Sequence, residues 1–593
     1  MSSLLVQAQT GTLTGHLIDK ATGGGVPFAN VVLVGTSLGG TTDDNGRFEI
    51  EDIPTGEYGL KVSLLAYQQK IVKFELLANQ TLNLGSISLE TDMLGLDEVV
   101  VSGTMKEVSR LESSVPVEVY SKVFFRANPT PSIFESLQNV NGVRPQLNCN
   151  VCNTGDIHIN GLEGPYTMVL IDGMPIVSGL STVYGLTGIP QSLIERVEIV
   201  KGPASTLYGS EAVGGMINII TKKPSSAPRA AVDVFATGWG EVNTDVGLKF
   251  NVGTKVSSLL GVNYFNYQNP IDNNNDGFTD LTLQDRISVF NKINIKRKDN
   301  RVFTLAGRYV YEDRWGGEMD WTDIYRGGDE IYGESIYTNR WEVFGLYQLP
   351  LKETVNFQFS ANGHSQNSVY GNVLYLADQY IGFGQLTWNK KLNRHDMLVG
   401  SAYRYTYYDD NTPATFNAIA DTNQASIIHL PGLFIQDEIS LNEFNKVLLG
   451  VRYDYNSLHG NIFTPRINYK WNTANKKNVL RISAGNGYRV ANVFTEDHAA
   501  LTGARTVEFQ GELDPETSWN ANVNFVKRFY TKSNGVIGID ATAFYTYFTN
   551  RILPDYESDP NKIIYGNLDG SSVSRGVSLN TDLALTNGFK ALA

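Results

Sequence analysis

Polar and apolar residues alternate along most of residues 229–593, and this period of two predicts β-strands. Residues 355–362 put Val, Phe, Phe and Ala on one face and Asn, Gln, Ser and Asn on the other. Residues 303–309 and 449–455 repeat the pattern with some exchange of small and aromatic side chains. One apolar and one polar face suit a sandwich or a barrel that is apolar outside and polar within. The number of repeats, the lack of intervening helices and the aromatic strand ends favour an antiparallel transmembrane β-barrel.

The first part of the chain, residues 10–90, is predicted as short strands separated by turns. Asn45-Gly46 is a strong hairpin signal because both positions tolerate a positive φ. Residues 114–224 contain further strands closed by Gly or Pro, at 157–162, 167–176 and 194–204, which lead into the glycine-rich stretch 208–222. The fold class expected is therefore dominated by β-structure: an amino-terminal β-sandwich, a smaller α+β domain and a large antiparallel barrel.

Composition excludes several classes of protein. The chain has 48 Lys and Arg against 61 Asp and Glu, a formal net charge of −13, which argues against a nucleic-acid-binding protein. It lacks an apolar run near 18 residues, so membrane-spanning helices are not expected. The 57 Gly, 30 Tyr and 27 Phe fit a many-stranded barrel with aromatic girdles, and two Cys are too few for a disulfide scaffold.

Two stretches resemble known families. Residues 46–58, Gly-Arg-Phe-Glu-Ile-Glu-Asp-Ile-Pro-Thr-Gly-Glu-Tyr, resemble the carboxypeptidase-regulatory-like β-sandwich, although a peptidase zinc motif is missing around the seven His. Taken together and in this order, residues 157–162, 167–176, 194–204 and 208–222 resemble the plug domain of TonB-dependent outer-membrane receptors and transporters. Barrel segments 433–438, 463–466, 487–491 and 513–518 resemble the same family. The resemblance implies a sandwich at 10–90, a linker at 91–113, a plug at 114–224 and a barrel at 229–593.

The length of the barrel region departs from this family. Its members close with 22 strands, and each hairpin with its turn and loop needs roughly 40 residues. The 365 residues from 229 to 593 therefore suffice for about nine hairpins. The chain also ends at Ala593 without the terminal aromatic residue usual for such barrels. We expect an incomplete barrel, truncated at its C-terminus, in a protein exported with a signal peptide to the bacterial outer membrane.

A β-prone stretch in the linker has two interpretations: a buried strand, or an exposed strand that pairs with the sheet edge of a partner. The resemblance implies the second, a TonB box captured by TonB from the periplasmic side. Its residues are Asp97, Glu98, Val99, Val100, Val101, Ser102 and Gly103.

Three charged residues follow within the plug, Glu195, Arg196 and Lys201. Because buried charges must be paired, we expect ion pairs between plug and barrel here rather than contacts to a ligand.

The cargo side of the plug offers weaker candidates. Asn148, Asn150 and Asn153 lie where plugs of this family raise their outward-facing loops, and are candidate ligand contacts. Cys149 and Cys152 form either a small disulfide or, with His158, a soft-metal site. Met168 and Met174 are core residues or, if copper is the cargo, thioether ligands.

One loop resembles the start of an EF-hand calcium loop. Oxygen ligands are expected from Asp272, Asn274, Asp276, Phe278 through its carbonyl, and Asp280. Position 12 is Leu283, so another carboxylate such as Asp285 must replace the usual Glu. A solvated polar loop explains the pattern equally well, and no other cofactor is expected.

The function implied is import of a scarce nutrient across the outer membrane: an iron-siderophore, haem, cobalamin or another metal complex. TonB and outer-membrane lipids are the expected partners. The alternative is a binding or signalling receptor of the same fold that works with a surface lipoprotein. An enzyme is not expected, since no nucleophile-base pair or carboxylate pair stands out.

Overall fold

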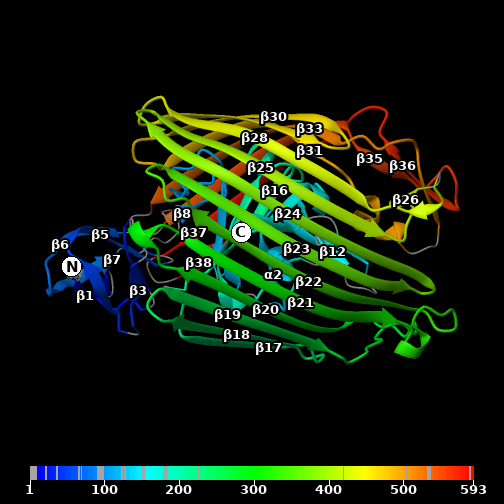
Figure 1. The fold of residues 1–593 in the computed structure, drawn as a ribbon, viewed down its shortest axis with the longest axis horizontal. Helices are drawn as coiled ribbons and strands as arrows, with labels where there is room; N and C mark the ends of the chain where they lie inside the picture. Colours follow the sequence, from blue (N-terminus) through cyan, green and yellow to red (C-terminus); the bar gives the residue numbers. More distant parts are fainter. Residues whose placement is uncertain are drawn as a thin grey trace, which may run out of the picture.

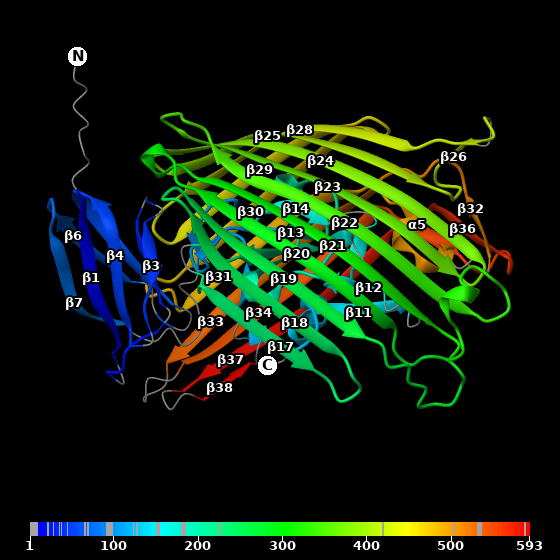
Figure 2. The same ribbon diagram turned by 60° about the horizontal axis from the view of Figure 1, so that its bottom comes forward.

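The computed structural model places a small domain at one end of a large curved sheet that surrounds a second domain (Figures 1 and 2). It describes residues 10–592 except 21–22, 28, 35, 37, 44, 65–66, 68–69, 90–98, 122–123, 126–128, 150–153, 178–179, 181–184, 225–226, 418–419, 502–504, 531–535 and 586–588. We call the end of the curved sheet beside the small domain the sandwich end, and the opposite end the loop end.

The small domain is the predicted β-sandwich. One sheet has the order β4-β1-β7 and the other β3-β2-β5-β6. Along β4 the side chains of Phe48, Ile50 and Ile53 are buried between the sheets. Gly46 takes a φ of 81° at the predicted turn, and a Cβ there would meet the Leu17 carbonyl. The strands are β1 (Thr10–Asp19), β2 (Asn30–Leu33), β3 (Gly39–Thr41), β4 (Arg47–Pro54), β5 (Gly56–Ser63), β6 (Lys70–Leu76) and β7 (Thr81–Leu89).

The surrounded domain, the plug, is built on a five-stranded sheet of order β10-β15-β16-β13-β14. Its apolar core includes Val169, Ile171, Val197, Ile199 and Ile217. Its strands are β10 (Glu118–Ser121), β11 (Val143–Cys149), β12 (Thr154–Ile159), β13 (Thr167–Ile171), β14 (Met174–Val177), β15 (Ile194–Lys201) and β16 (Gly215–Thr221). Its helical turns are α2 (Ile133–Ser136), η1 (Leu137–Asn139), η2 (Gly164–Tyr166), η3 (Gln191–Leu193) and α4 (Ser205–Tyr208). Two short strands precede it, β8 (Val99–Val100) and β9 (Val108–Ser109).

The large sheet contains 17 strands in the described part of the chain, each antiparallel to the next. The strands are β17 (Ala230–Ala236), β18 (Val242–Val252), β19 (Val256–Tyr267), β20 (Leu283–Ile295), β21 (Phe303–Gly317), β22 (Gly333–Gln348), β23 (Thr354–Tyr370), β24 (Val373–Leu392), β25 (His395–Asp410), β28 (Ser426–Ser440), β29 (Asn445–Asn456), β30 (Gly460–Asn472), β31 (Asn478–Arg489), β33 (Glu516–Tyr530), β34 (Val536–Asn550), β37 (Ser572–Ala584) and β38 (Lys590–Leu592). Among the described residues no pairing joins β17 to β38, so the expected incomplete barrel is confirmed.

Shorter elements lie between the barrel strands. Most of them cover the loop end: η5 (Asp323–Tyr325), β26 (Phe416–Asn417), β27 (Thr422–Asn423), α5 (Val493–Glu496), η6 (His498–Ala500), β32 (Thr506–Phe509), β35 (Ile552–Asp555) and β36 (Lys562–Asn567). The turn η4 (Lys298–Asn300) lies at the sandwich end.

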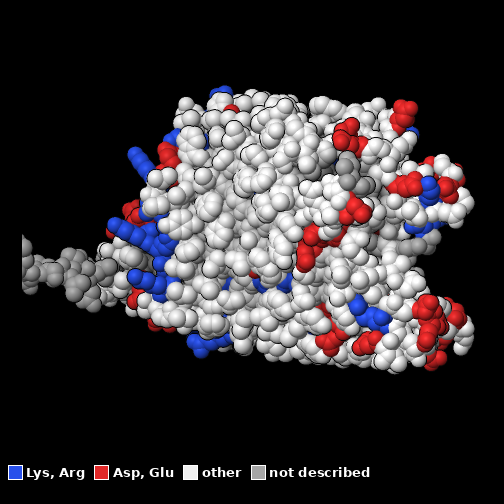
Figure 3. Space-filling view, turned by 45° about the vertical axis from the view of Figure 1, so that its right-hand side comes forward, with Lys and Arg blue, Asp and Glu red and all other residues white. Residues whose placement is uncertain are grey.

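The strand faces follow the predicted alternation. On β23 the Ser360, Asn362 and His364 side chains are buried toward the plug, whereas Phe357 is exposed on the outer face. Across the barrel the outer face carries exposed Val, Leu, Ile, Phe, Tyr and Trp, as lipid contact requires. Within the described residues no helix has the length and apolarity to cross a bilayer. Lys and Arg gather at the sandwich end, and Asp and Glu at the loop end (Figure 3).

The plug lies in the lumen, as the sequence hypothesis requires. Plug Asp172 pairs with Lys292 of β20 at 2.8 Å. Plug Glu211 pairs with Arg404 of β25 at 3.4 Å. The Arg308 guanidinium of β21 donates to the Gly185 carbonyl at 2.8 Å. These contacts reach two separate walls of the barrel, so the plug is surrounded rather than docked on one side.

Candidate functional site

From Val99 onward the linker lies between the plug and the barrel wall and folds back on itself. Strand β8 pairs antiparallel with β9, with Val99 opposite Ser109 and Val100 opposite Val108. Val100 is fully buried and Ser102 is 1% exposed. The strand is therefore held within this chain.

A single buried carboxylate holds the residues that follow β8. The Glu198 Oε2 accepts the Val101 and Ser102 amides, each at 2.9 Å, and the Ser102 hydroxyl at 2.7 Å. The Glu198 Oε1 pairs with the Arg196 guanidinium at 2.7 Å. Glu198 lies on β15 and its side chain is fully buried, so it joins the linker to an inner strand of the plug sheet. We call this arrangement the Glu198 clasp.

Further contacts close around Ser102. The Asn218 amide donates to the Ser102 hydroxyl at 2.9 Å, and the Tyr208 hydroxyl donates to the Ser102 carbonyl at 3.0 Å. Burial, and then the Glu198 carboxylate, raise the pKa of Tyr208, which stays a neutral donor. The barrel contributes Arg466, which donates to the Gly103 carbonyl at 3.1 Å. A force applied to this strand would therefore be transmitted to both the plug sheet and the barrel wall.

The next part of the linker is fastened to the barrel wall by charges. Glu112 meets three lysines of the barrel, Lys446 at 3.8 Å, Lys470 at 3.3 Å and Lys476. Burial acts to raise the pKa of Glu112, but the hydrogen bond from Lys476 and the lysine charges lower it to about 2. The Arg481 guanidinium caps the backbone by donating to the carbonyls of residues 110, 111 and 113.

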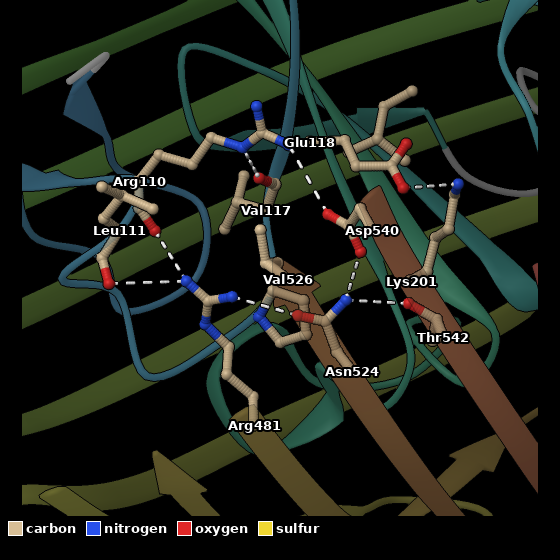
Figure 4. Close-up of a pocket in the computed structure, with 12 residues that line it drawn as sticks. Arg110, Leu111, Val117, Glu118, Lys201, Arg481, Asn524, Val526, Asp540 and Thr542 are labelled. Atoms are coloured by element: carbon tan, nitrogen blue, oxygen red, sulfur yellow. Dashed lines mark hydrogen bonds and ion pairs between the residues drawn. The ribbon is translucent and has the colours of Figure 1, made fainter. Parts of the chain in front are cut away.

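A pocket lined by both charged and apolar residues lies beside this segment, between plug and barrel (Figure 4). On the plug side, Lys201 pairs with Glu118 at 2.7 Å. On the barrel side, Asn524 donates to Asp540 at 2.5 Å and accepts from Arg481 at 3.0 Å. Glu118 opens β10, the edge strand of the plug sheet that follows the linker directly.

At the loop end the plug contacts the barrel through a second charged network. The Glu516 carboxylate accepts the Tyr166 hydroxyl at 2.9 Å and pairs with Arg489 at 2.5 Å. Arg551 donates to the same Tyr166 hydroxyl at 3.1 Å and pairs with Glu163 at 3.0 Å. Tyr166 and Glu516 are each 1% exposed. This loop-end network ties the plug's outer turn to the long loops of residues 490–515 and 551–571.

Family comparisons agree with the three-part architecture. The TonB-dependent receptor-like β-barrel matches residues 231–592, the TonB-dependent receptor plug domain residues 109–216, and the CarboxypepD_reg-like domain residues 13–101. The chain belongs to the TonB-dependent receptor family. This family consists of receptors and transporters rather than enzymes. Membership implies that the sandwich end faces the periplasm and the loop end faces the outside of the cell.

Known proteins similar to this TonB-dependent receptor include an iron-regulated outer membrane virulence protein of Vibrio cholerae. It is 25% identical over 424 residues, which cover 68% of this chain and 61% of the relative. The siderophore receptor PirA of Pseudomonas aeruginosa has a TM-score of 0.57 at 16% identity, covering 79% of this chain and 81% of that one. The ferric enterobactin receptor PfeA of the same organism has TM-scores of 0.62 and 0.63 in two structures, each at 16% identity and covering 80% of this chain and 79% of that one.

Five of the seven predicted TonB-box residues can be placed, because Asp97 and Glu98 lie outside the described residues. The exposed strand expected for the box is wrong for Val100 and Ser102, which are buried. The physical reason is Glu198: a buried carboxylate needs hydrogen-bond donors, and the box supplies three. Capture by TonB stays a prediction and would require release from the clasp.

The expectation of plug-barrel ion pairs at Glu195, Arg196 and Lys201 is wrong. Arg196 pairs with Glu195 and Glu198, and Lys201 with Glu118, all within the plug. Strand β15 lies between β10 and β16, so its side chains meet those of neighbouring plug strands first. The plug instead reaches the barrel from turns and loops, through Asp172, Glu211 and Glu163.

The apical cysteine loop remains largely a prediction. Asn150, Cys152 and Asn153 lie outside the described residues, and only the backbone of Asn148 and Cys149 is described, at the end of β11. His158 is placed: its Nε2 lies 2.9 Å from the Asp156 carboxylate, whose hydrogen bond raises the pKa of the imidazole.

Met168 and Met174 are buried in two different apolar clusters of the plug. At 1% and 2% exposure they fill the plug core. The thioether-ligand interpretation gains no neighbouring metal-binding group, since no group of three or more His, Cys, Asp or Glu gathers among the described residues.

In the loop of residues 272–280 the carboxylates accept hydrogen bonds from amides of the same loop. Asp272 accepts the Asp276 and Gly277 amides, and Asp280 accepts both the backbone and side-chain amides of Asn273. Asp285 lies on β20, where it accepts from Tyr264 and Asn266 rather than completing the loop. Calcium binding stays a prediction.

Because the pKa of Glu112 is low, the contacts that dock the linker should weaken in acid and stay unchanged near neutral pH. Because its pKa is lowered from 4.5 to about 2, its contribution is fully present above about pH 4.5 and is lost as pH falls toward 2. A spin label at Glu107→Cys, with Cys149 and Cys152 replaced by Ser, should keep constant mobility from pH 7 to 5 and become mobile between pH 4.5 and 2. Glu112→Gln should abolish that acid step; an unchanged step would assign the titration to another group.

Proposed function

We propose that this protein imports a scarce nutrient, foremost a ferric siderophore, across the outer membrane with energy delivered by TonB. Family membership supports a receptor or transporter of the outer membrane. The similar proteins include an iron-regulated outer membrane protein, a siderophore receptor and a ferric enterobactin receptor. The chain spans 61% of the length of the curated relative, so activity, cargo and partners are proposed for the whole protein.

The Glu198 clasp is the observation that carries the proposal. Three hydrogen bonds join the backbone and hydroxyl of the box to an inner plug strand. Force applied to the box therefore reaches β15 directly, and through residues 110–117 it reaches the edge strand β10. Such a connection suits a plug that is remodelled by a partner on the periplasmic side, and it needs no catalytic residue.

Deletion of residues 97–103 from the full-length protein tests energy coupling. The variant is produced in a strain without other siderophore receptors, and uptake of radioactive iron is measured with one catecholate and one hydroxamate siderophore. We expect binding at the cell surface to persist and uptake to fall to the level of a strain without TonB. Uptake that survives the deletion would eliminate TonB-driven import and leave the signalling receptor with a surface lipoprotein, an alternative that no contact among the described residues favours.

A further inference from the structure

Charge is divided between the two ends of the barrel (Figure 3). The loops at the extracellular end, residues 237–241, 268–282, 318–332, 371–372, 411–425, 457–459, 490–515 and 551–571, hold 19 Asp and Glu and four Lys and Arg. The turns at the periplasmic end, residues 253–255, 296–302, 349–353, 393–394, 441–444 and 473–477, hold nine Lys and Arg and three Asp and Glu. The periplasmic turns therefore form a basic rim on a protein whose net charge is −13.

The rim is densest where two neighbouring turns meet. The Lys296 amide donates to the Lys255 carbonyl at 2.7 Å, one step beyond the pair Val256 and Ile295 of β19 and β20. The two lysines are thus opposite each other across adjacent strands, an arrangement that like charges destabilise. Lys298 follows in the same turn, so three ammonium groups are concentrated on a short stretch of surface.

These lysines are exposed, and the described residues offer Lys255, Lys296 and Lys298 no ion-pair partner. The arginines beside them are fixed. Arg297 stacks 3.9 Å from the Tyr347 ring and donates to the Gln348 carbonyl at 2.6 Å, while Arg301 pairs with Asp299 at 2.8 Å. The three lysines, next to two arginines held in place by their contacts, give this surface a net positive charge. An external anion can neutralise that charge.

The same rim borders apolar surface. Val252, Val302 and Leu351 lie in or beside the turns at 59%, 47% and 52% exposure. They continue the apolar outer face of the barrel up to the lysines. A ligand that matches both features carries an anionic group and a long apolar part, as a phospholipid does and a free anion does not.

We propose that the rim formed by Lys255, Lys296, Arg297, Lys298 and Arg301 binds the headgroups of anionic phospholipids in the periplasmic leaflet of the outer membrane. Phosphate oxygens accept from the ammonium groups and the acyl chains lie against Val252, Val302 and Leu351. Such binding fixes the height of the barrel in the bilayer, and so the position of the box relative to the periplasm. It goes beyond the proposed function, because it holds whichever cargo is imported.

Native mass spectrometry of the full-length protein in detergent tests this proposal. The protein is incubated with equal amounts of phosphatidylglycerol and phosphatidylcholine, and the lipids retained are compared. We expect retention of phosphatidylglycerol to dominate and to fall with salt. Lys296→Ala/Lys298→Ala should lower the preference at least about tenfold, since each cation near an anionic lipid surface contributes favourably.

Lys70→Ala/Lys73→Ala, which removes two exposed lysines from the sandwich strand β6, is the matched control and should leave the preference unchanged. An equal loss in this control, or none in the rim variant, overturns the proposal. Inorganic phosphate at the lipid concentration should not displace the lipid, and displacement would make the rim a site for free anions. If the rim variant does not fold, a salt-independent preference in the unmodified protein overturns the proposal.

Discussion

Replacing Glu198 with Ala is expected to speed hydrogen exchange of the Val101 and Ser102 amides about 100-fold. Both amides and the Ser102 hydroxyl lose their acceptor together. Hydrogen bonds to a charged group contribute about 1.5–3 kcal/mol each, and the three share one oxygen, so a combined loss of about 3 kcal/mol is reasonable. Exchange measured by mass spectrometry on the full-length protein gives the rates. Glu198→Gln keeps a neutral acceptor, so its exchange rates should lie between those of the unmodified protein and those of Glu198→Ala.

Glu195→Ala is the matched control, because it removes a carboxylate three positions away on the same strand. Glu195 is one-third exposed and contacts Arg196 rather than the box. Its variant should leave both amides protected. Exchange in β13, residues 167–171, separates release of the box from unfolding of the plug: it should stay slow in every variant. Equal protection of the box in Glu198→Ala and Glu195→Ala would show that the clasp does not hold it.

Release of the box has a consequence for coupling. In the docked state the box cannot pair with the sheet edge of a partner, because the Val101 and Ser102 amides donate to Glu198 and β8 is paired with β9. A receptor without the clasp should therefore bind the C-terminal domain of TonB whether or not cargo is present. Cargo-dependent binding in the unmodified protein and cargo-independent binding in Glu198→Ala would make the clasp the element that cargo must influence.

The sequence predicted the architecture well because strands and domains leave local patterns. The period of two identified the lipid-facing and lumen-facing residues of β23. Asn45-Gly46 identified a turn of the sandwich, but the hairpin predicted there is wrong, because the strands before and after it, β3 and β4, belong to different sheets. The plug was recognised by motifs rather than derived from physical pattern. Contacts between distant parts of the chain leave no local pattern in the sequence. Ser102 and Glu198 are 96 positions apart, and a glutamate in a strand does not by itself indicate which donors it will meet.

Glu198 had a detectable signal all the same. It is a charged residue within the β15 pattern Ile-Glu-Arg-Val-Glu-Ile-Val-Lys, and burial forces such a residue to find donors. The box, with its backbone amides and the Ser102 hydroxyl, is the source that the structure shows. The error at Glu195, Arg196 and Lys201 came from applying the same rule with the wrong partner, the barrel in place of the neighbouring plug strands.

Barrel segments that carried the family resemblance acquire a physical role in the structure. Arg466 donates to the Gly103 carbonyl of the box, and Glu438 accepts from Ser114 at 2.7 Å. Arg489 pairs with Glu516 and packs 4.5 Å from the Tyr166 ring. Each of these residues points inward from its strand to the plug or linker. The motifs of the barrel wall therefore describe the lining that holds the plug, which alternation alone could not identify.

Glu516→Ala is expected to loosen the plug's outer turn and the extracellular loops together. The Glu516 carboxylate is buried and accepts hydrogen bonds from the Tyr166 hydroxyl, the Arg489 guanidinium and the Ile552 amide. Removing one member of a buried ion pair costs about 3–5 kcal/mol where the remaining charge is left unpaired. Because Arg489 keeps Glu496 at 2.5 Å as a second partner, we expect a loss at the lower end, about 3 kcal/mol. Exchange of the Ile552 amide should accelerate more than about 100-fold, and residues 163–166 of the plug should exchange faster as well.

Glu512→Ala is the control for this experiment, since Glu512 lies in the same loop and is exposed. It should leave both regions protected. The decisive comparison is between loop and plug in Glu516→Ala. If only residues 490–516 and 551–571 exchange faster, the extracellular loops and the outer turn of the plug are held independently of each other. If residues 163–166 respond too, Glu516 couples them. Cargo that draws Arg489 or Arg551 away from their carboxylates at the extracellular side could then loosen the plug, whose β15 holds the box at the periplasmic side.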